Sequence, residues 1–187
     1  MTGHAIGMFL HIAGALGISA ALALEWAGLR QIRSAILPEQ VRAWIGTLKG
    51  ANRVLFVSML ANVLTGLFMM VTEWGPEAWI VVSLGSLVLM IVLAMALTRP
   101  RMASIGQAAL ANEKRPTSQT FHNLAGYPLL WISIQTRVAV FLGILYLMIA
   151  KPEWVGSLIT TGVAIVLGIA TALPMPRRER AQEGPAD

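Results

Sequence analysis

Five long apolar stretches constrain the fold of this 187-residue chain more than any other feature. A helix needs about 20 predominantly apolar residues to cross the hydrocarbon core of a bilayer. The stretches cover residues 5–29, 54–72, 79–98, 128–149 and 154–173. The sequence lacks the short alternating apolar and polar segments that are typical of an outer-membrane barrel. It therefore predicts an all-α, polytopic membrane helix bundle with about five transmembrane helices, forming one domain over residues 1–173.

The composition supports this class and excludes several others. Only 12% of the residues are charged and 56% are hydrophobic, whereas a soluble domain carries about 25% charged residues. These values argue against a soluble enzyme, a disordered chain and a nucleic-acid-binding domain despite the net charge of +5. The absence of cysteine excludes disulfides, thiolate zinc sites, iron–sulfur clusters and covalently attached haem. The expected partner is the lipid bilayer and not a nucleic acid.

The positive charges predict the orientation. All Lys and Arg residues other than Arg137 and Lys151 follow the first, third or fifth apolar stretch. By the positive-inside rule, the N-terminus lies outside and the C-terminus is cytoplasmic. The Ala, Gly and Arg usage favours a bacterial inner (plasma) membrane. Residues 174–187, rich in Arg, Glu and Pro, are predicted to form a disordered cytoplasmic tail.

A short amphipathic helix is predicted over residues 38–49, before the second span. Its apolar residues recur at i, i+3, i+4 and i+7, with Pro38 at the start and Gly50 as a stop. These apolar residues are Val41, Trp44, Ile45 and Leu48. We expect this helix to lie on the inner membrane surface. The third span is nearly all Val, Leu, Met and Ile beyond Ser86, so we expect it to face lipid or a second copy of the protein.

A polar stripe runs along the first span, because its polar and small residues follow one another at spacings of three and four. Its members are His4, Gly7, His11, Gly14, Ile18, Ala21, Glu25 and Gly28. Lipid offers no partner to an imidazole or a carboxylate, so this polar stripe is expected to face the bundle. One interpretation makes it a functional surface. The alternative is a packing seam in which a neighbouring helix satisfies His11.

Two polar residues on other spans are candidate partners of the polar stripe. Arg137 lies well inside the fourth span, and we hypothesise that it pairs with Glu25 in the inner leaflet. The alternative is that Arg137 extends to water alone. Asn62, on the second span, is expected to hydrogen-bond across to another helix. His11, Glu25, Asn62 and Arg137 form the predicted polar, functional face.

A metal site is an alternative use of the outer leaflet. His4, Met8, His11 and Met69 combine imidazole and thioether groups, which suit Cu(I). Methionine is also an ordinary filler of apolar interiors, so these residues need no metal. A haem b held by two histidines is improbable, because His122 is expected near the opposite face from His11, but ligation by one His or by His and Met stays open.

The segment Phe9–Gly14 resembles the first helix of small bacterial multi-pass proteins that are predicted to be integral to the membrane and have no assigned function. It is less closely similar to the copper-resistance D-like family and to the membrane protoporphyrinogen oxidase (HemJ) family. The segment Arg137–Pro152 looks like a pattern in the first of these groups. Similarity to the copper and haem families implies His11 as a ligand.

The sequence contains no nucleophile elbow, phosphate loop, zinc-protease motif or paired intramembrane carboxylates, which lowers the expectation of catalysis. We predict that the protein binds or passes a small solute or ion along the polar face, or assembles with a partner membrane protein or as a homo-oligomer. No cofactor is predicted. The alternative function is copper or haem handling through His11 and the nearby methionines at the outer leaflet.

Overall fold

The structure is a computed structural model that describes residues 2–111 and 125–173. Every regular element within these ranges is helical. The elements are α1 (Thr2–Ser34), α2 (Pro38–Met69), the π-helix η1 (Met70–Trp74), α3 (Ala78–Leu93), the π-helix η2 (Ala94–Thr98), α4 (Arg99–Ala111), α6 (Pro128–Ala150) and α7 (Trp154–Ala172). Five helices in the described ranges are long and apolar enough to cross a membrane. The predicted all-α membrane helix bundle is confirmed.

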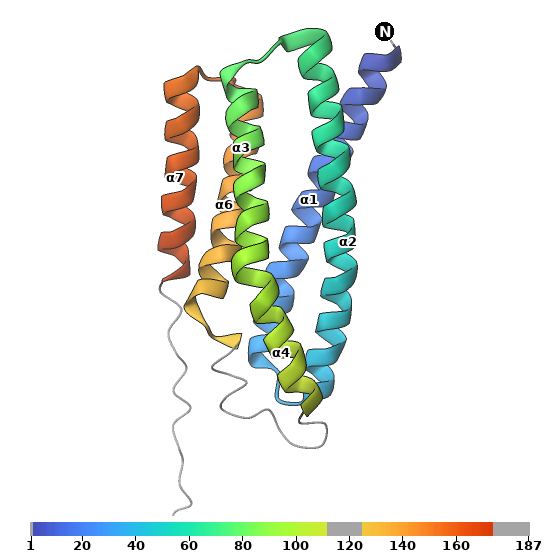
Figure 1. Cartoon of the computed structure of the whole chain (residues 1–187), viewed down its shortest axis with the longest axis vertical. Helices are drawn as coiled ribbons and strands as arrows, with labels where there is room; N and C mark the ends of the chain where they lie inside the picture. The colour runs from blue at the N-terminus through green and yellow to red at the C-terminus, as the bar shows by residue number, and fades with distance from the viewer. Residues whose placement is uncertain (1, 112–124, 174–187) are drawn as a thin grey trace, which may run out of the picture.

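The helices stand side by side (Figure 1). α1 packs along α2, and α6 packs along α7, while α3 contacts both α6 and α7. The rod formed by α3, η2 and α4 runs antiparallel to α2 (Figure 1). Pro38 and Pro128 occupy the first turns of α2 and α6, where a missing N–H costs nothing. The bundle therefore consists of two tightly packed pairs joined through α3 and α6.

The separate helix predicted over residues 38–49 is wrong, because α2 continues through Gly50 to Met69. A Cβ on Gly50 would meet nothing within 4 Å, so no tertiary contact interrupts the helix there. A glycine inside a helix costs about 1 kcal/mol relative to alanine, and the hydrogen bonds of the continuing helix outweigh that cost. Val41 and Leu48 are buried in a cluster with residues of α1, α4 and α6. The amphipathic face thus packs against protein.

The third span was expected to face lipid or a second copy, but only one of its faces is exposed, with Val88 and Val92 on it. Ser83, Ser86, Leu87 and Met90 of α3 are buried within the protein. Two of them are serines, whose small side chains allow neighbouring helices to approach closely. Instead α2 is the most exposed span. Of its most apolar 18 residues only 6% are buried, whereas the corresponding share for the rod Ala78–Leu110 is 33%. Mean hydropathy alone did not distinguish these two positions in the bundle.

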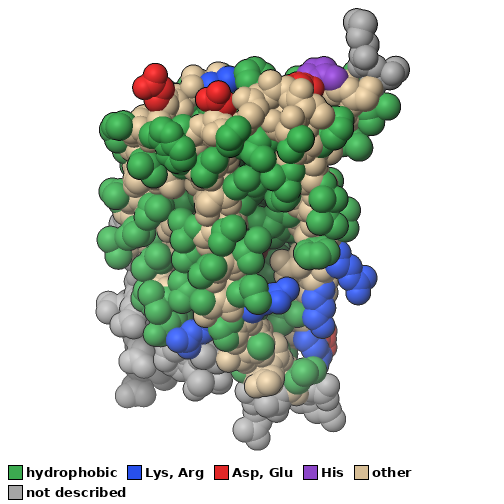
Figure 2. All heavy atoms as spheres, turned by 45° about the horizontal axis from the view of Figure 1, so that its top comes forward, with side chains coloured by type: hydrophobic (Ala, Val, Ile, Leu, Met, Phe, Trp, Pro, Cys, Tyr) green, Lys and Arg blue, Asp and Glu red, His purple; other side chains and the backbone are tan. Residues whose placement is uncertain are grey.

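Charged side chains gather at the two ends of the bundle, with apolar side chains between them (Figure 2). One end, hereafter the cation-rich end, carries the described basic residues of α1, the first half of α2, and α4. These are Arg30, Arg33, Arg42, Lys49, Arg53, Arg99 and Arg101. Tryptophans mark both ends: Trp26 lies under Arg30 at 4.5 Å, and Trp74 lies 3.5 Å from the Lys151 ammonium.

Which end faces the cytoplasm stays a prediction. The predicted tail over 174–187 and the residue His122 lie outside the described ranges.

Candidate functional site

The polar stripe of α1 faces the bundle over most of its length. Gly7, Gly14, Ala21, Glu25 and Gly28 are all buried, as the spacing predicts. At Gly14 the helices approach so closely that a Cβ would lie 2.9 Å from the Ser58 carbonyl oxygen and 3.2 Å from Asn62 Cβ. A small residue is therefore required at this crossing of α1 and α2.

Next to this crossing, His11 and Asn62 bond to each other's helix. His11 Nδ1 lies 3.1 Å from the Asn62 carbonyl oxygen and 3.1 Å from Thr65 Oγ1. Because a carbonyl oxygen only accepts, Nδ1 carries the ring proton and donates. In return, the Asn62 side chain donates to the His11 carbonyl oxygen at 3.0 Å. The expectation that Asn62 bonds across to another helix is confirmed, and α2 satisfies Nδ1 of His11.

The other residues of the predicted metal set make different contacts. His4 forms an ion pair with Glu73, which ties the start of α1 to η1. Met8 is 45% exposed on the outside of α1. Over residues 2–111 and 125–173, no group of three or more His, Cys, Asp or Glu residues is arranged to hold a metal ion. Copper or haem handling by His4, Met8, His11 and Met69 stays a prediction.

Glu25 and Arg137 form an ion pair between α1 and α6. Arg137 Nη2 donates to Glu25 Oε1 at 2.6 Å, and the two side chains are only 2% and 9% exposed respectively. The hypothesised pair is confirmed. The alternative, in which Arg137 extends to water alone, is wrong because its guanidinium is buried against this carboxylate.

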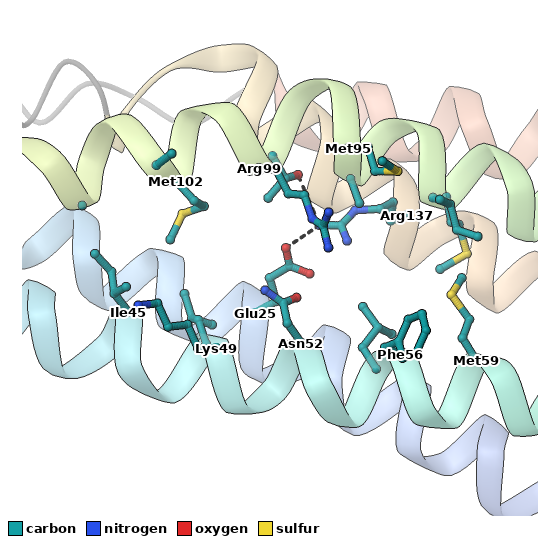
Figure 3. A pocket seen from close by; sticks show the side chains of 18 of the residues that line it. Glu25, Ile45, Lys49, Asn52, Phe56, Met59, Met95, Arg99, Met102 and Arg137 are labelled. Carbon is teal, nitrogen blue, oxygen red and sulfur yellow. Dashed lines mark hydrogen bonds and ion pairs between the residues drawn. The ribbon is translucent and has the colours of Figure 1, made fainter.

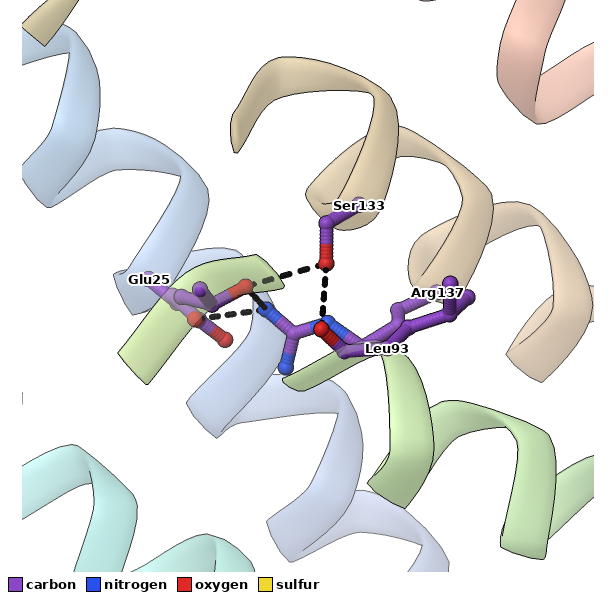
Figure 4. A network of polar contacts seen from close by, with 5 residues as sticks. Glu25, Leu93, Ser133 and Arg137 are labelled. Carbon is purple, nitrogen blue, oxygen red and sulfur yellow. Dashed lines mark hydrogen bonds and ion pairs between the residues drawn. The ribbon is translucent and has the colours of Figure 1, made fainter. Parts of the chain in front are cut away.

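A directed chain of hydrogen bonds continues from Arg137 to α3 (Figure 4). Arg137 Nη2 donates to Thr98 Oγ1 at 3.4 Å, Thr98 lies 3.0 Å from Ser133 Oγ, and Ser133 donates to the Leu93 carbonyl oxygen at 3.1 Å. Since each hydroxyl has one proton, Thr98 must donate to Ser133. Each hydroxyl oxygen thus accepts a hydrogen bond from the side nearer the guanidinium and donates one on the far side.

The sequence analysis did not single out Thr98 or Ser133. Ser133 precedes Arg137 by four residues, which places both on one face of α6 and was the available signal. Thr98 ends the π-helix η2, which lies against this pair. Short π segments inside helices occur frequently at functional sites.

The ion pair leaves two polar atoms without a partner. Glu25 Oε2 and Arg137 Nε are buried and have no hydrogen bond within the described part of the chain. An unsatisfied buried polar atom costs about 1–3 kcal/mol, and more when it belongs to a charged group. The pair therefore retains one unused acceptor and one unused donor.

A cavity of about 760 Å³ lies beside the pair, between α2 on one side and α3, η2 and α4 on the other (Figure 3). Glu25 and Arg137 both line it. Most of its other wall residues are apolar: Ile45, Leu48, Leu55, Phe56, Met59, Leu60, Val63, Met90, Ile91, Ala94, Met95, Met102, Ala103 and Leu110. This volume lies in the range of about 300–1,000 Å³ that is typical of small-molecule sites.

The predicted polar face is therefore two separate sites. Glu25 and Arg137 line the cavity, whereas His11 and Asn62 do not and instead join α1 to α2. An amphipathic molecule fits the first site, because the cavity combines apolar walls with an unsatisfied carboxylate oxygen. The second site is a helix contact in which the His11 and Asn62 side chains each bond to the facing helix.

Comparison with family models, with curated proteins and with solved structures finds no match for this chain. The resemblance carried by Phe9–Gly14 and Arg137–Pro152 accordingly stays a prediction.

Proposed function

We propose that the protein binds a small amphipathic molecule from the membrane in the cavity beside the Glu25–Arg137 pair. The observation that carries this proposal is the buried, unpartnered Oε2 of Glu25, a residue that lines a cavity with mainly apolar walls. A hydroxyl or amide of the ligand would donate to this oxygen. Its apolar part would lie against the side chains of α2 and α3.

This proposal narrows the function expected from the sequence, which was binding or passage of a small solute or ion, or assembly with a partner. A bare ion would leave the long apolar walls of the cavity unused, and so would a fully polar solute. The apolar walls favour a molecule that already resides in the bilayer. We further propose a bacterial inner membrane, with the cation-rich end facing the cytoplasm by the positive-inside rule.

Photolabelling can test this binding. The residue to examine must line the cavity and be buried from the lipid that surrounds the bundle. Met90 is 2% exposed, yet it lines the cavity. The probe is a monoacylglycerol with a diazirine in its chain, supplied in vesicles that contain the purified protein. We expect label on Met90. Exposed residues of α7, such as Val166, report on ordinary contact with lipid.

A matched pair of variants makes the test specific. Ala94 lines the cavity, whereas Ala96 lies in the same π-helix and is exposed without lining it. A94F should strongly reduce the label on Met90, because the larger side chain fills the cavity, and A96F should leave it unchanged. Absence of label on Met90 in the native protein would refute the proposal, as would equal labelling of Met90 in A94F.

A further inference from the structure

Two cations line the cavity near the ion pair without an acidic partner of their own. Lys49 extends from α2 and Arg99 begins α4, and both belong to the cavity wall (Figure 3). Neither forms an ion pair with any residue in the described ranges. The charge of Glu25 is already balanced by Arg137. The cavity therefore carries an excess positive charge.

The α2 wall of the cavity changes from polar to apolar beyond Asn52. Lys49 and Asn52 on α2, and Arg99 and Gln107 on α4, line the cavity together with apolar residues such as Ile45 and Met102. Beyond Asn52 the α2 wall is apolar as far as Val63, and Asn52–Val63 covers about 16.5 Å at 1.5 Å per residue. One leaflet of hydrocarbon is about 15 Å thick, half of a 30 Å core. The apolar part is thus long enough for one acyl chain.

We propose that the cavity binds an acidic membrane lipid, with its anionic headgroup at Lys49 and Arg99 and one acyl chain between α2 and α3. This inference rests on the proposed function and names its ligand class. Charge complementarity selects this occupant, because a zwitterionic headgroup would leave the two cations unbalanced. The apolar α2 wall from Leu55 to Val63 also matches an acyl chain that points from these two cations towards the midplane.

Native mass spectrometry can measure the binding of defined lipids to the whole protein in mild detergent. The probes are phosphatidylglycerol and phosphatidylcholine with identical acyl chains. We expect the native protein to retain phosphatidylglycerol about 30-fold more strongly than phosphatidylcholine. This factor is the attraction of two cations near a membrane surface for an anionic lipid. K49Q/R99Q should abolish this preference. R30Q/R53Q removes the same charge from the same end, at residues that do not line the cavity, and should preserve it.

The outcomes separate this inference from the proposed function. Equal retention of both lipids, lost in A94F but not in A96F, would overturn the inference and leave amphiphile binding standing. A preference that survives in K49Q/R99Q would also overturn the inference. Retention of both lipids unaffected by A94F would overturn both proposals. Displacement of phosphatidylglycerol by millimolar inorganic phosphate would identify a free-anion site instead, and a dimer that A94F abolishes would identify a second copy as the occupant.

Discussion

Removing one member of the Glu25–Arg137 pair should destabilise the bundle far more than removing both. In E25L, the guanidinium of Arg137 stays 2% exposed, loses its bond of 2.6 Å, and keeps only Thr98 at 3.4 Å. Breaking a buried ion pair in this way costs about 3–5 kcal/mol. For a chain of this size, each kcal/mol lowers Tm by roughly 2–4 °C, so we expect a decrease of about 6–20 °C.

The double variant provides the decisive comparison. E25L/R137M replaces both charges with apolar side chains of similar length, a change that is often neutral or stabilising in a buried site. R137M also removes the cost of inserting an arginine into the membrane. We therefore expect the double variant to melt closer to the native protein than either E25L or R137M does alone.

Thermal unfolding in mild detergent, followed by circular dichroism, measures these differences. E77L and R53M are the controls, because both residues are exposed and lie outside the pair, and each should change stability by less than about 0.5 kcal/mol. If E25L has the same Tm as the native protein, the carboxylate does not stabilise the buried guanidinium. If the double variant is as unstable as the two single losses combined, the side chains act independently, and the coupling argued here is refuted.

Three further predictions concern other parts of the bundle. G168V should separate α6 from α7 and lower the folded yield, because a Cβ at Gly168 would lie 2.9 Å from the Thr136 backbone nitrogen. G162V is the control on the same helix and should fold normally, since a Cβ at Gly162 meets nothing within 4 Å. Equal yields of the two variants in a fluorescence-detected size-exclusion assay would contradict this prediction. N62L removes an interhelical hydrogen bond and should cost about 0.6 kcal/mol, up to about 1.7, in a detergent melt; no loss would show that the bond to His11 adds nothing. Because no cofactor is predicted, the purified protein should show no Soret band and no stoichiometric copper, and a signal that H11A abolishes would establish the alternative function.

Most of the helix positions followed from local pattern. Transmembrane length and hydropathy predicted five spans, and spacings of three and four predicted which face of α1 is buried, including Gly14 and Glu25. These signals depend on the residues of one segment and on the lipid around it, so they need no tertiary information. The interpretation of residues 38–49 failed because Gly50 is a stop signal only when no longer helix is stabilised by packing. Here Val41 and Leu48 pack against α1, α4 and α6.

Two residues of the candidate site can be recognised in the sequence, and two others only in the structure. Glu25 and Arg137 are recognisable in the sequence because each is an ionisable residue within an apolar span, and a buried charge requires a partner. Thr98 and Ser133 are ordinary residues of their helices, and their contacts depend on how α3 and α6 are rotated about their axes. No periodicity in either segment reports that rotation.

The sequence by itself determined that the chain forms an all-α bundle of apolar helices, that its cations collect beside three of its five spans, and that Glu25 and Arg137 need partners inside the bundle. The reason is that burial of helices in lipid depends mainly on hydropathy, which is additive along the chain. Only the tertiary structure decided that α3 buries one of its faces while α2 is the most exposed span, and that a cavity opens between them beside the ion pair. A cavity depends on the tilt and separation of helices, which arise from the simultaneous packing of residues far apart in the sequence.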